Sequence, residues 1–575
     1  MKFAFKPIAI AAALAFIGTA AVASPMKPGT YTAKVNGHNA PLTVEVTVDA
    51  NKILSIKTPD DQESLGVGKV GLKKTADNIL RYQSIGVDAV TGATFSSNAL
   101  KEGVEKCLKQ AGADMKQFTR KAEKHPIHNR TYQADVVVIG GGGAGLASAI
   151  SSMQAGAKKV IVLEKLGYVG GSTNVSEGAL NAVDDQRQKA QGIKDSYETF
   201  YETTMHGGHD KGDPTLVRFL TSHSMDAVNW LESLGVKFND HIGAATGSLG
   251  QRSHYPATPY GNTYIRTFEK VIADSNGKIQ VLLDTPAVKL IQNKSGRVVG
   301  VVGNNFGSKV TVMAKDGVII ATGGFGANVA YRQKVNTGVW KNIKLDNSIG
   351  CTNIQKAAQG QGLFLAQKVG AKLIGLSDIQ IHPCGTPGTG LMENIRTSGR
   401  NRIFVNSDGN RFVNEGAARD VLANAIFQQK GRTYWIVVNK LRYPTPDFKD
   451  RMGASIRNME ALGAVVEAPT LDELAKKTGM NAENLKKAIA DYNAVVSGKA
   501  KDKLGFVANN KDDKQMTEGP WYACRKVPTV HHTMGGIKIN VKSQVINTKG
   551  KVIPGLYAVG EVTGGIHGSN RLGGN

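Results

Sequence analysis

The amino-acid sequence predicts an α/β protein in which a mainly parallel sheet is interrupted by an inserted α+β capping domain and preceded by a small α+β domain. Buried-strand runs that end in glycine turns occur at 134–145, 160–165 and 317–326, and such a run returns only at 552–565. Short continuous apolar runs are typical of parallel strands with both faces covered. The intervening segment at 378–505 instead contains a polar loop, a strand run and two helix patterns, which predicts a separate capping unit.

The composition is that of a globular protein with an excess of glycine. A chain of 575 residues predicts three or four domains. Hydrophobic residues at 41% and charged residues at 21% exclude a mostly disordered or collagen-like protein. Sixty-seven residues are glycine, well above the average share of about 7%. Many backbone positions are therefore expected to need positive φ or a close approach to a ligand.

The net charge of +24 favours an anionic substrate, an acidic partner or an anionic surface, but charge alone does not choose among them. The chain has no basic run interleaved with aromatic residues, no zinc-finger spacing and no helix-turn-helix pattern. Nucleic-acid binding is therefore disfavoured.

Residues 26–120 are predicted to form the small α+β domain. Alternating apolar and polar residues predict three strands, a glycine-punctuated segment predicts a helix, and a second helix closes the unit. These elements are expected at 31–35, 42–48, 52–58, 70–82 and after Ser96. Residues 121–130 are charged and contain a proline, which predicts a linker in which His125 and His128 are solvated.

The α/β domain is predicted in two parts, at 131–377 and 506–575, with the capping domain at 378–505 between them. Within the cap, the run at 434–439 predicts a strand. The capping box Thr470-Leu-Asp-Glu473 predicts the start of a helix that follows.

Residues 1–23 predict a secretory signal peptide and therefore a periplasmic protein. Two lysines precede an apolar stretch at 8–22, and Ala21-Val22-Ala23 gives an A-x-A cleavage site. A membrane anchor is the less favoured alternative, because a spanning helix needs about 20 apolar residues. No later segment is long and apolar enough to span a membrane, so no membrane span is expected.

The four cysteines, Cys107, Cys351, Cys384 and Cys524, are far apart and form no C-x-x-C pair. This spacing excludes c-type haem attachment and disfavours a zinc or iron–sulfur site. A disulfide between Cys351 and either Cys384 or Cys524 stays open in an oxidising compartment. His206 and His209 have a spacing that metals use, but no acidic or sulfur ligands cluster beside them, so no metal site is predicted.

A glycine motif marks the start of the α/β domain. Gly140-x-Gly142-x-x-Gly145 follows a strand and opens a helix, and Glu164 ends the next strand about 20 residues further on. Glycines let the backbone approach a pyrophosphate, the helix N-terminus supplies N–H groups, and the carboxylate accepts from a ribose hydroxyl. An ordinary tight turn is the alternative, but the strand, helix and carboxylate together predict a Rossmann-like dinucleotide site.

Further glycine turns favour FAD over NAD as the dinucleotide. They are Gly170-Gly171-Ser172-Thr173, Ala321-Thr322-Gly323-Gly324 and Gly560-Glu561. Turns dispersed in this way suit a long, buried flavin that is held without a covalent bond. The α/β domain is therefore predicted to bind FAD.

From Tyr132 onward the chain resembles the FAD-containing subunits of the fumarate reductase and succinate dehydrogenase superfamily, in particular periplasmic fumarate reductases and urocanate reductases. The segments VHHTMGG at 530–536 and GEVTGGIHGSNRLGGN at 560–575 carry the resemblance. The glycine motifs and the resemblance together assign FAD to Gly140, Gly142, Ala144, Gly145, Glu164, Ser172, Thr173, Gly178, Val288, Gly323 and Glu561.

The segment Asp88-Ala-Val-Thr-Gly92-Ala93-Thr94 is similar to the motif of FMN-binding domains. In that motif the last threonine carries FMN through a phosphoester, so the resemblance implies covalent FMN on Thr94 and a separate flavin transferase. A Gly-Ala-Thr turn that caps a helix is the alternative. A signal peptide before the motif and a flavoprotein sequence behind it favour FMN.

Reduction of a C=C bond beside a carboxylate needs a hydride donor, cations that polarise the carboxylate, and an acid on the opposite face. The resemblance implies that Arg571 and His531 bind one carboxylate, that His382 holds the distal one, and that Arg419 donates the proton. Arginine is a credible acid only in a desolvated site beside other cations. An ordinary salt bridge in the cap is the alternative for Arg419. By the same resemblance, Glu393 and Arg396 relay protons to Arg419.

The chain departs from the family pattern at three places. Met392 stands where fumarate reductases have a threonine that helps to hold the distal carboxylate, and methionine cannot donate a hydrogen bond. Gln359-Gly360-Gln361-Gly362 replaces a Thr-Gly-Asp-Gly segment beside the flavin. Relatives continue past the position of Asn575, so the sequence is expected to be incomplete.

Fumarate, reduced to succinate, is the leading expected substrate, and urocanate or another aryl or alkyl enoate is the alternative. Urocanate reductases carry a tyrosine where His382 stands. With one dinucleotide motif and no haem motif, electrons are expected from a periplasmic c-type cytochrome through FMN to FAD. A flavin electron carrier without substrate chemistry and an oxidase or dehydrogenase working in reverse are the other classes.

Overall fold

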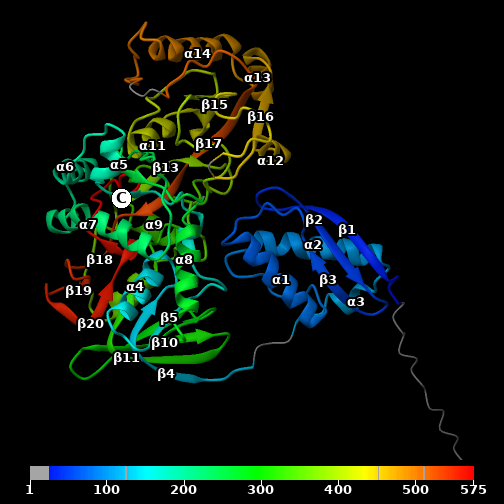
Figure 1. Cartoon of the computed structure of the whole chain (residues 1–575), viewed down its shortest axis with the longest axis vertical. Coiled ribbons are helices and arrows are strands. Elements are labelled where there is room, and N and C mark those ends of the chain that lie inside the picture. Colours follow the sequence, from blue (N-terminus) through cyan, green and yellow to red (C-terminus); the bar gives the residue numbers. More distant parts are fainter. Residues whose placement is uncertain (1–24, 123–125, 259, 451, 509–511) are drawn as a thin grey trace, which may run out of the picture.

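The computed structural model describes residues 25–122, 126–258, 260–450, 452–508 and 512–575. The predicted signal peptide and His125 lie outside these residues. Figure 1 shows three parts: a small N-terminal domain in blue, a large body built around a long sheet, and a cap that carries α13 and α14.

The N-terminal domain is an antiparallel sheet packed against helices. Its elements are β1 (Gly29–Asn36), β2 (Pro41–Val48), β3 (Ile53–Lys57), α1 (Gly68–Tyr82), α2 (Thr94–Gln110) and α3 (Met115–Phe118). Val44 of β2 and Leu100 and Val104 of α2 are fully buried in one core. A Cβ at Gly103 would lie 2.4 Å from Val44, so glycine allows the helix to approach the sheet. The three strands and two helices expected here are confirmed.

The large body is organised around one mixed sheet with the order β19-β20-β11-β4-β5-β8, to which β10 and β9 are added beside β11. These strands are β4 (Arg130–Ile139), β5 (Val160–Leu163), β8 (Ile279–Leu282), β9 (Ala287–Gln292), β10 (Val298–Asn305), β11 (Ser308–Ile320), β19 (Gln544–Ile546) and β20 (Val552–Ala558). The five from β20 to β8 run parallel. This confirms the predicted parallel sheet.

Both faces of the sheet are buried, as the apolar runs predicted. Val137 and Ile139 of β4 point into one core, and Val138 between them points into a second core shared with Leu146 of α4 (Gly143–Gln154). Opposite faces alternate in this way because side chains along a strand point to alternate sides.

Smaller elements surround the sheet. They are η1 (Gly171–Val175), β6 (Leu180–Asn181), α5 (Asp185–Ala190), α6 (Tyr197–Gly207), α7 (Pro214–Ser233), β7 (Ser253–His254), α8 (Asn262–Ala273), α9 (Val329–Lys334), α10 (Gln361–Lys368), β12 (Leu373–Ile374), β18 (Gly536–Lys538), η3 (Gly560–Val562) and β21 (Thr563–Gly564). β12, β18 and β21 form a small second sheet, and β6 pairs with β7.

The cap is a second mixed unit of strands and helices. Its elements are β13 (Ile379–Gly385), β14 (Arg402–Val405), α11 (Arg419–Phe427), η2 (Lys430–Arg432), β15 (Tyr434–Asn439), α12 (Ile456–Ala461), β16 (Val465–Ala468), α13 (Leu471–Thr478), α14 (Ala482–Val496) and β17 (Trp521–Thr533). The Thr470 side chain caps α13 by accepting from the Glu473 N–H, as the capping box predicted.

The central strand of the cap sheet comes from beyond the expected limit at residue 505. β17 pairs with β13, β15 and β16. Trp521 and Ala523 face one cap core, and Tyr522 and Cys524 face the other. The same strand runs on into the body at its far end, so the boundary lies inside a strand and no composition change marks it.

The N-terminal domain lies against both the body and the cap. Val90 and Ala93 pack with Leu166 and Tyr168 in a small apolar cluster, and the Tyr168 hydroxyl donates to the Gly92 carbonyl at 3.2 Å. This contact places the N-terminus of α2 beside the body.

Among the described residues, two polar contacts reach the cap from the N-terminal domain. His38 Nε2 lies 3.0 Å from Glu393 Oε1, and Lys449 Nζ donates to Gln62 Oε1 at 3.1 Å. The domain is therefore tied to the part of the chain that covers the body.

In the described part of the chain, no helix is both long and apolar enough to cross a membrane. All four cysteines are described and buried, and each is a free thiol, so the structure contains neither of the disulfides left open by the sequence.

Candidate active site

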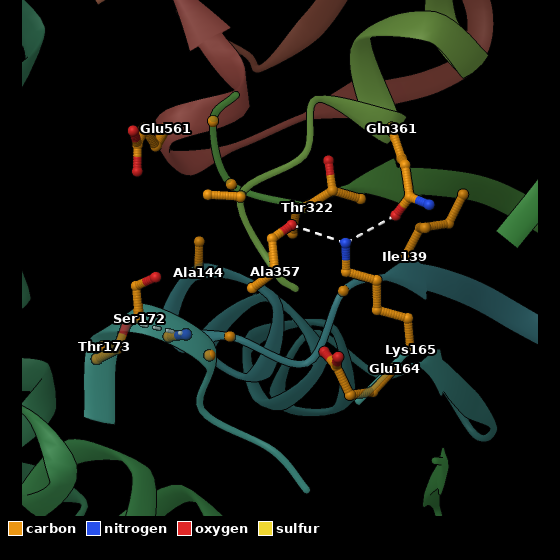
Figure 2. A pocket seen from close by; sticks show the side chains of 18 of the residues that line it. Ile139, Ala144, Glu164, Lys165, Ser172, Thr173, Thr322, Ala357, Gln361 and Glu561 are labelled. Carbon is orange, nitrogen blue, oxygen red and sulfur yellow. Dashed lines mark hydrogen bonds between the residues drawn. The ribbon is translucent and has the colours of Figure 1, made fainter. Parts of the chain in front are cut away.

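A pocket opens where the parallel strands of the body end. Ile139, Leu163 and Ile320 pair across β4, β5 and β11, so the loops after them meet at one edge, which is where α/β sheets bind ligands. Figure 2 shows the pocket with Glu164, Ser172 and Glu561 around it. The lining residues include Gly140, Gly142, Ala144, Glu164, Lys165, Ser172, Thr173, Thr322, Gly323, Ala357, Gln361 and Glu561.

The predicted glycine motif builds the floor of this pocket. Gly140 has φ +106°, which glycine adopts readily. A Cβ at Gly145 would lie 1.8 Å from the Gly140 carbonyl oxygen, so the first turn of α4 can pack on the strand only with glycine there. Gly142 precedes α4 and supplies no side-chain cap; the Gly143 N–H donates to Thr173 Oγ1 at 3.3 Å, and the N-terminus of α4 points its N–H groups toward an anionic ligand.

The pocket fits a dinucleotide. A Cβ at Gly142 would meet no atom closer than 3.9 Å and one at Gly323 none within 4 Å, so glycine keeps open space where a ligand would lie. Thr322 lines the same space, and its Oγ1 atom is buried without a hydrogen-bond partner.

Glu164 is held in place by the backbone around it. Its two carboxylate oxygens accept from the Gly141 N–H at 2.6 Å and the Leu166 N–H at 2.7 Å. Burial raises the pKa of Glu164 above its ordinary value, although these N–H groups favour the carboxylate. The side chain stays at the pocket wall, where the predicted contact with a ribose would form.

Lys165 is a pocket residue that sequence reasoning missed. Its ammonium group donates to the Ala357 carbonyl and to Gln361 Oε1, both at 2.8 Å (Figure 2). Burial lowers the pKa of Lys165 to about 8, against the attraction of Glu164. Gln361 belongs to the segment that departs from the family pattern, so that departure changes a contact inside the pocket.

Three predicted FAD residues do not line the pocket. Gly145 lies beneath Gly140, and Gly178 accepts the Tyr264 hydroxyl at 2.6 Å through its carbonyl. Val288 is 48% exposed, whereas the residues just before it, Pro286 and Ala287, line the pocket. The other eight predicted FAD residues are all in its wall.

The predicted substrate residues gather beside this pocket. β13 and β17 pair so that His382 lies opposite Thr529 and Gln380 lies opposite His532, and the His382 and His531 rings are 4.8 Å apart. Arg571 follows on the C-terminal loop, with its backbone carbonyl accepting from the Gln380 amide at 2.6 Å.

Arg419 begins α11 and is buried, with 6% of its surface exposed. Its Nε donates to the Thr246 carbonyl at 2.9 Å and its Nη1 to Gln380 Oε1 at 2.8 Å. Burial, followed by the positive charge of Arg571, lowers the pKa of Arg419 to about 9. This is the desolvated site beside other cations that a proton-donating arginine requires.

The surroundings of His382 and His531 favour the neutral ring. Burial first, and then neighbouring positive charges, lower the pKa of His382 and of His531 well below its ordinary value. The Cys384 N–H donates to His382 Nδ1 at 3.1 Å. Since Nδ1 accepts, the ring proton is on Nε2, so His382 presents an N–H donor to an anion.

Arg571 also points into this cluster. Its Nε donates to the Asn575 carbonyl at 2.9 Å. Burial lowers the pKa of Arg571, and the attraction of Glu561 opposes that shift. Glu561 lines the dinucleotide pocket and accepts from the Thr533 N–H at 3.0 Å. The cation cluster and the pocket therefore share a wall.

The two predicted relay residues are held apart. Glu393 pairs with His38, and its backbone carbonyl accepts the Lys526 ammonium. Arg396 instead pairs with Glu177, at 3.7 Å between Nη1 and Oε1. Glu177 is a further residue that sequence reasoning missed.

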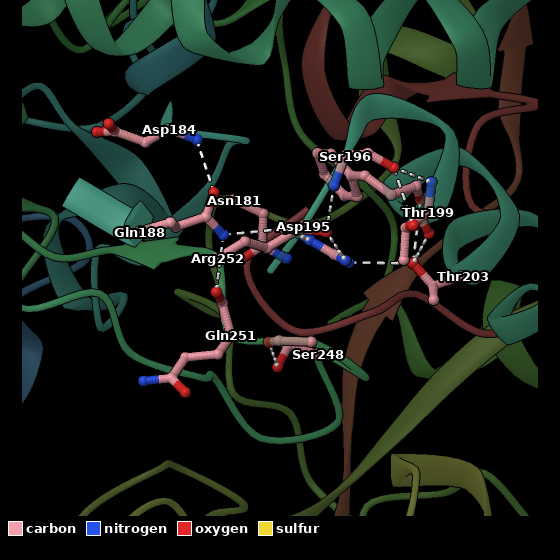
Figure 3. Close-up of polar contacts among 12 residues, drawn as sticks. Asn181, Asp184, Gln188, Asp195, Ser196, Thr199, Thr203, Ser248, Gln251 and Arg252 are labelled. Carbon is pink, nitrogen blue, oxygen red and sulfur yellow. Dashed lines mark hydrogen bonds and ion pairs between the residues drawn. The ribbon is translucent and has the colours of Figure 1, made fainter. Parts of the chain in front are cut away.

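A buried network holds the loop that faces Arg419. Arg252 donates to both carboxylate oxygens of Asp195, at 2.7 and 2.8 Å, and to the Thr203 hydroxyl at 3.0 Å. Figure 3 shows these side chains together. Both side chains of the pair are at most 4% exposed. The loop that this pair anchors includes Thr246, whose carbonyl receives Arg419, so the network fixes the arginine's acceptor.

Thr94 is the first residue of α2 and is exposed. It is followed by Phe95, 66% exposed, whose ring packs edge-on against His38 at 5.6 Å. Thr94 is therefore accessible on the side of the domain that contacts the cap through His38.

His209, one of the two histidines with metal-like spacing, contacts Ser569 at 2.8 Å and Asp420 at 3.2 Å. Among the described residues, no group of three or more metal-binding side chains comes together.

The fold and site define a protein with one domain for a dinucleotide and a second small domain before it. A FAD binding domain family matches residues 135–575, and an FMN-binding domain family matches residues 37–109. The chain therefore belongs to the FAD-dependent enoate reductase family, whose members here are fumarate, urocanate and acrylate reductases, and it carries an FMN-binding domain ahead of the FAD-binding domain.

Individual relatives agree with this. Urocanate reductase of Eggerthella lenta is 34% identical, over 94% of this chain and 89% of the relative. NADH:acrylate oxidoreductase of Vibrio harveyi is 34% identical over 95% of this chain, which spans only 59% of that protein. The open conformation of a flavocytochrome c3 fumarate reductase superposes with a TM-score of 0.60 at 34% identity, covering 77% of this chain and 75% of the other.

Proposed function

We propose that this protein is an exported, periplasmic reductase that adds two electrons and two protons to the C=C bond of an α,β-unsaturated carboxylate, with fumarate as the leading substrate. The observation that carries the proposal is the buried cluster of Arg419, Arg571, His382 and His531 against the wall of the FAD pocket. Cations in a dry site stabilise negative charge far more than they do in water.

The residues divide the chemistry among them. FAD, when bound and reduced, supplies the hydride. Arg571 and His531 bind the carboxylate that gains charge as the hydride arrives, and the His382 Nε2–H holds the far end of the substrate. Arg419 donates the proton to the other carbon, and its lowered pKa makes that transfer easier than for an arginine in water.

One observation favours a second substrate class. Met392 replaces the hydrogen-bond donor that would help His382 to hold a distal carboxylate, so a smaller or less polar acid fits this position as well. Acrylate is such an acid, and the Vibrio harveyi relative is named for it. Urocanate and other aryl or alkyl enoates are the remaining alternatives.

The electron path is proposed to run from a periplasmic c-type cytochrome through FMN to FAD. Thr94 carries FMN through a phosphoester that a flavin transferase forms, since its hydroxyl is exposed at the start of α2. Thr94→Ala should abolish flavin fluorescence of the denatured polypeptide on a gel. If fluorescence persists in the variant, the attachment is elsewhere.

The activity is tested by anaerobic oxidation of reduced methyl viologen with the purified, flavinylated protein. Fumarate, urocanate, acrylate, methacrylate and cinnamate are compared, with Arg419→Ala as the control. Turnover of one acid that is lost in the variant supports the proposal and names the substrate class. No turnover of any acid by protein whose two flavins are reducible would favour a flavin electron carrier.

A further inference from the structure

One loop of the body lies against both the FAD pocket and the FMN-binding domain. This loop, residues 165–175, follows the end of β5 and includes η1. Four of its residues line the FAD pocket, namely Lys165, Gly171, Ser172 and Thr173 (Figure 2). Other residues of the same loop contact the FMN-binding domain. Because one short segment makes both sets of contacts, the position of that domain is tied to the wall of the pocket.

Tyr168 makes the central contact between this loop and the FMN-binding domain. Only 4% of its surface is exposed, and its hydroxyl donates to the Gly92 carbonyl at 3.2 Å. It packs with Val90 and Ala93 in the small apolar cluster between the two parts. Gly92 has φ +93°, and a Cβ there would lie 2.6 Å from the Tyr168 hydroxyl oxygen, so glycine permits this close approach.

Two further contacts hold the loop to the FMN-binding domain. The Asn174 amide donates to the Gly66 carbonyl at 3.2 Å, and only 3% of the Asn174 surface is exposed. The Lys74 ammonium donates to the Gly167 carbonyl. These contacts involve α1 and the chain just before it, whereas Tyr168 contacts the chain just before α2. The loop therefore holds the domain at two separate places, which fixes its orientation as well as its position.

The chain that Tyr168 contacts leads directly to the proposed attachment residue for FMN. Residues 90–94 form a turn, in which the Ala93 N–H donates to the Val90 carbonyl at 2.9 Å. Thr94 ends this turn, begins α2 and is exposed, although Ala93 beside it is buried against the body. The Thr94 side chain thus extends from a turn that is held to a loop of the FAD pocket.

We propose that Tyr168 holds the turn at residues 90–94 against the body and thereby sets the position from which electrons pass from FMN to FAD. This inference rests on the proposed function, in which Thr94 carries FMN and the substrate is reduced at FAD. In the step concerned, reduced FMN loses two electrons and oxidised FAD gains them, with protons exchanged with water. No further oxidant or reductant takes part. Tyr168 acts through the turn that it holds and is therefore a positioning residue.

The test starts from full-length flavinylated protein in which both flavins are reduced with dithionite. It is mixed anaerobically with excess fumarate, and in parallel with excess acrylate, in a stopped-flow spectrometer. The proposed path predicts two phases of flavin reoxidation, because the electrons of FAD reach the substrate first and those of FMN follow through FAD. The first phase reports the substrate reaction and the second reports passage between the flavins. Failure of the proposed function is a separate result, because the parent protein would then show no first phase.

Three variants are compared with the parent. Tyr168→Phe removes the hydroxyl, and Tyr168→Ala also removes the ring. Tyr264→Phe is the matched control, because the buried Tyr264 also donates to a glycine carbonyl, that of Gly178, but within the body. We expect Tyr168→Ala to slow the second phase at least about tenfold, since a hydrogen bond and an apolar contact are both lost. Tyr168→Phe should lie between this variant and the parent. The first phase and the control should keep the parent rates.

A second readout is independent of electron transfer. In the resting flavinylated protein, the thiol of Val90→Cys should react only when the domain leaves the body, because Val90 is buried there. Adding Tyr168→Phe should raise the labelling rate about tenfold, the effect of one buried hydrogen bond, and adding Tyr168→Ala should raise it further. If Tyr168→Ala does not retain FAD, Tyr168→Phe decides the case by its labelling rate. Unchanged labelling in Tyr168→Phe, or a second phase in Tyr168→Ala that keeps the parent rate, would overturn the inference.

Discussion

The ion pair between His38 and Glu393 predicts that docking of the FMN-binding domain depends on pH. Burial alone would lower the pKa of His38, but pairing with Glu393, helped by Asn39 and Glu63, raises it from 6.5 to about 9. Because the docked state holds the proton more tightly, this stabilisation of docking is fully present below pH 6.5 and is lost as the pH rises through about 9.

The size of the effect follows from the shift. Each pKa unit corresponds to about 1.4 kcal/mol, so the whole shift sets an upper limit of about 3 kcal/mol. Asn39 and Glu63 belong to the same domain as His38, so their share of the pKa shift does not contribute to docking. The His38 side chain is 29% exposed, so solvent also screens part of its attraction to Glu393. We expect docking to weaken by about 1.4 kcal/mol, or tenfold, between neutral and high pH.

The assay uses a cysteine placed at the docking surface. Val90 is buried against the body, and all native cysteines are buried as well, so the thiol of Val90→Cys should react only when the domain undocks. Its labelling rate, divided by that of a small free thiol at each pH, gives the open fraction. This ratio should rise about tenfold between pH 7 and pH 10, as estimated above from the pKa shift.

The matched variants separate the ion pair from general loosening. Adding His38→Gln should raise the ratio at pH 7 and leave it flat with pH, whereas Lys449→Gln, which removes the other polar contact with the cap, should leave the pH dependence intact. A flat ratio in the parent, or an unchanged slope with His38→Gln, would refute the reasoning.

Three other predictions follow from the site. The rate of flavin reoxidation by substrate should fall as pH rises through about 9, because Arg419 donates only when protonated; a pH-independent rate up to pH 10 would contradict this. Glu164→Gln should weaken FAD binding by deflavinated protein about 10- to 100-fold, because it replaces a charge-assisted hydrogen bond by a neutral one. Unchanged affinity in a flavin titration would show that Glu164 does not contact FAD. Asp195→Asn leaves Arg252 buried and unpaired, which costs about 3–5 kcal/mol, so the thermal midpoint of the body should drop by several degrees, while Lys194→Ala, at an exposed position beside it, changes little.

Much of the fold could be predicted because local patterns encode it. Apolar runs with glycine turns marked β4, β5, β11 and β20, and the capping box marked the start of α13. The limit of the cap could not be predicted, because the first half of β17 pairs with β15 in the cap and its second half pairs with β13 at the substrate site. A strand shared by two units carries no change in composition at the boundary.

The pocket was largely predictable for the same reason. Glycine turns at strand ends identify positions that need positive φ or open space, as at Gly140 and Gly323. Near Val288, it is Pro286 and Ala287 that line the pocket, while Val288 itself is exposed on β9.

The partners of the charged residues could not be predicted from spacing. Glu177 of the body meets Arg396 of the cap, and His38 of the N-terminal domain meets Glu393 of the cap. Nothing local to Glu177 or His38 marks these pairs, because tertiary packing alone brings them together. Gln380 accepts from Arg419 and donates to the Arg571 carbonyl. Its position in an ordinary strand gives no sign of this role in the sequence.

The measurement that tests the central claim most directly is a single turnover without an electron donor. Enzyme reduced by a stoichiometric amount of dithionite is mixed anaerobically with fumarate, and in parallel with acrylate, while the flavin absorbance is recorded and the product is quantified. We predict reoxidation with one saturated acid formed per two electrons removed, and a loss of both signals in Arg419→Ala. Reoxidation that proceeds equally well in Arg419→Ala, or flavin that stays reduced with every enoate while an added cytochrome oxidises it, would contradict the account.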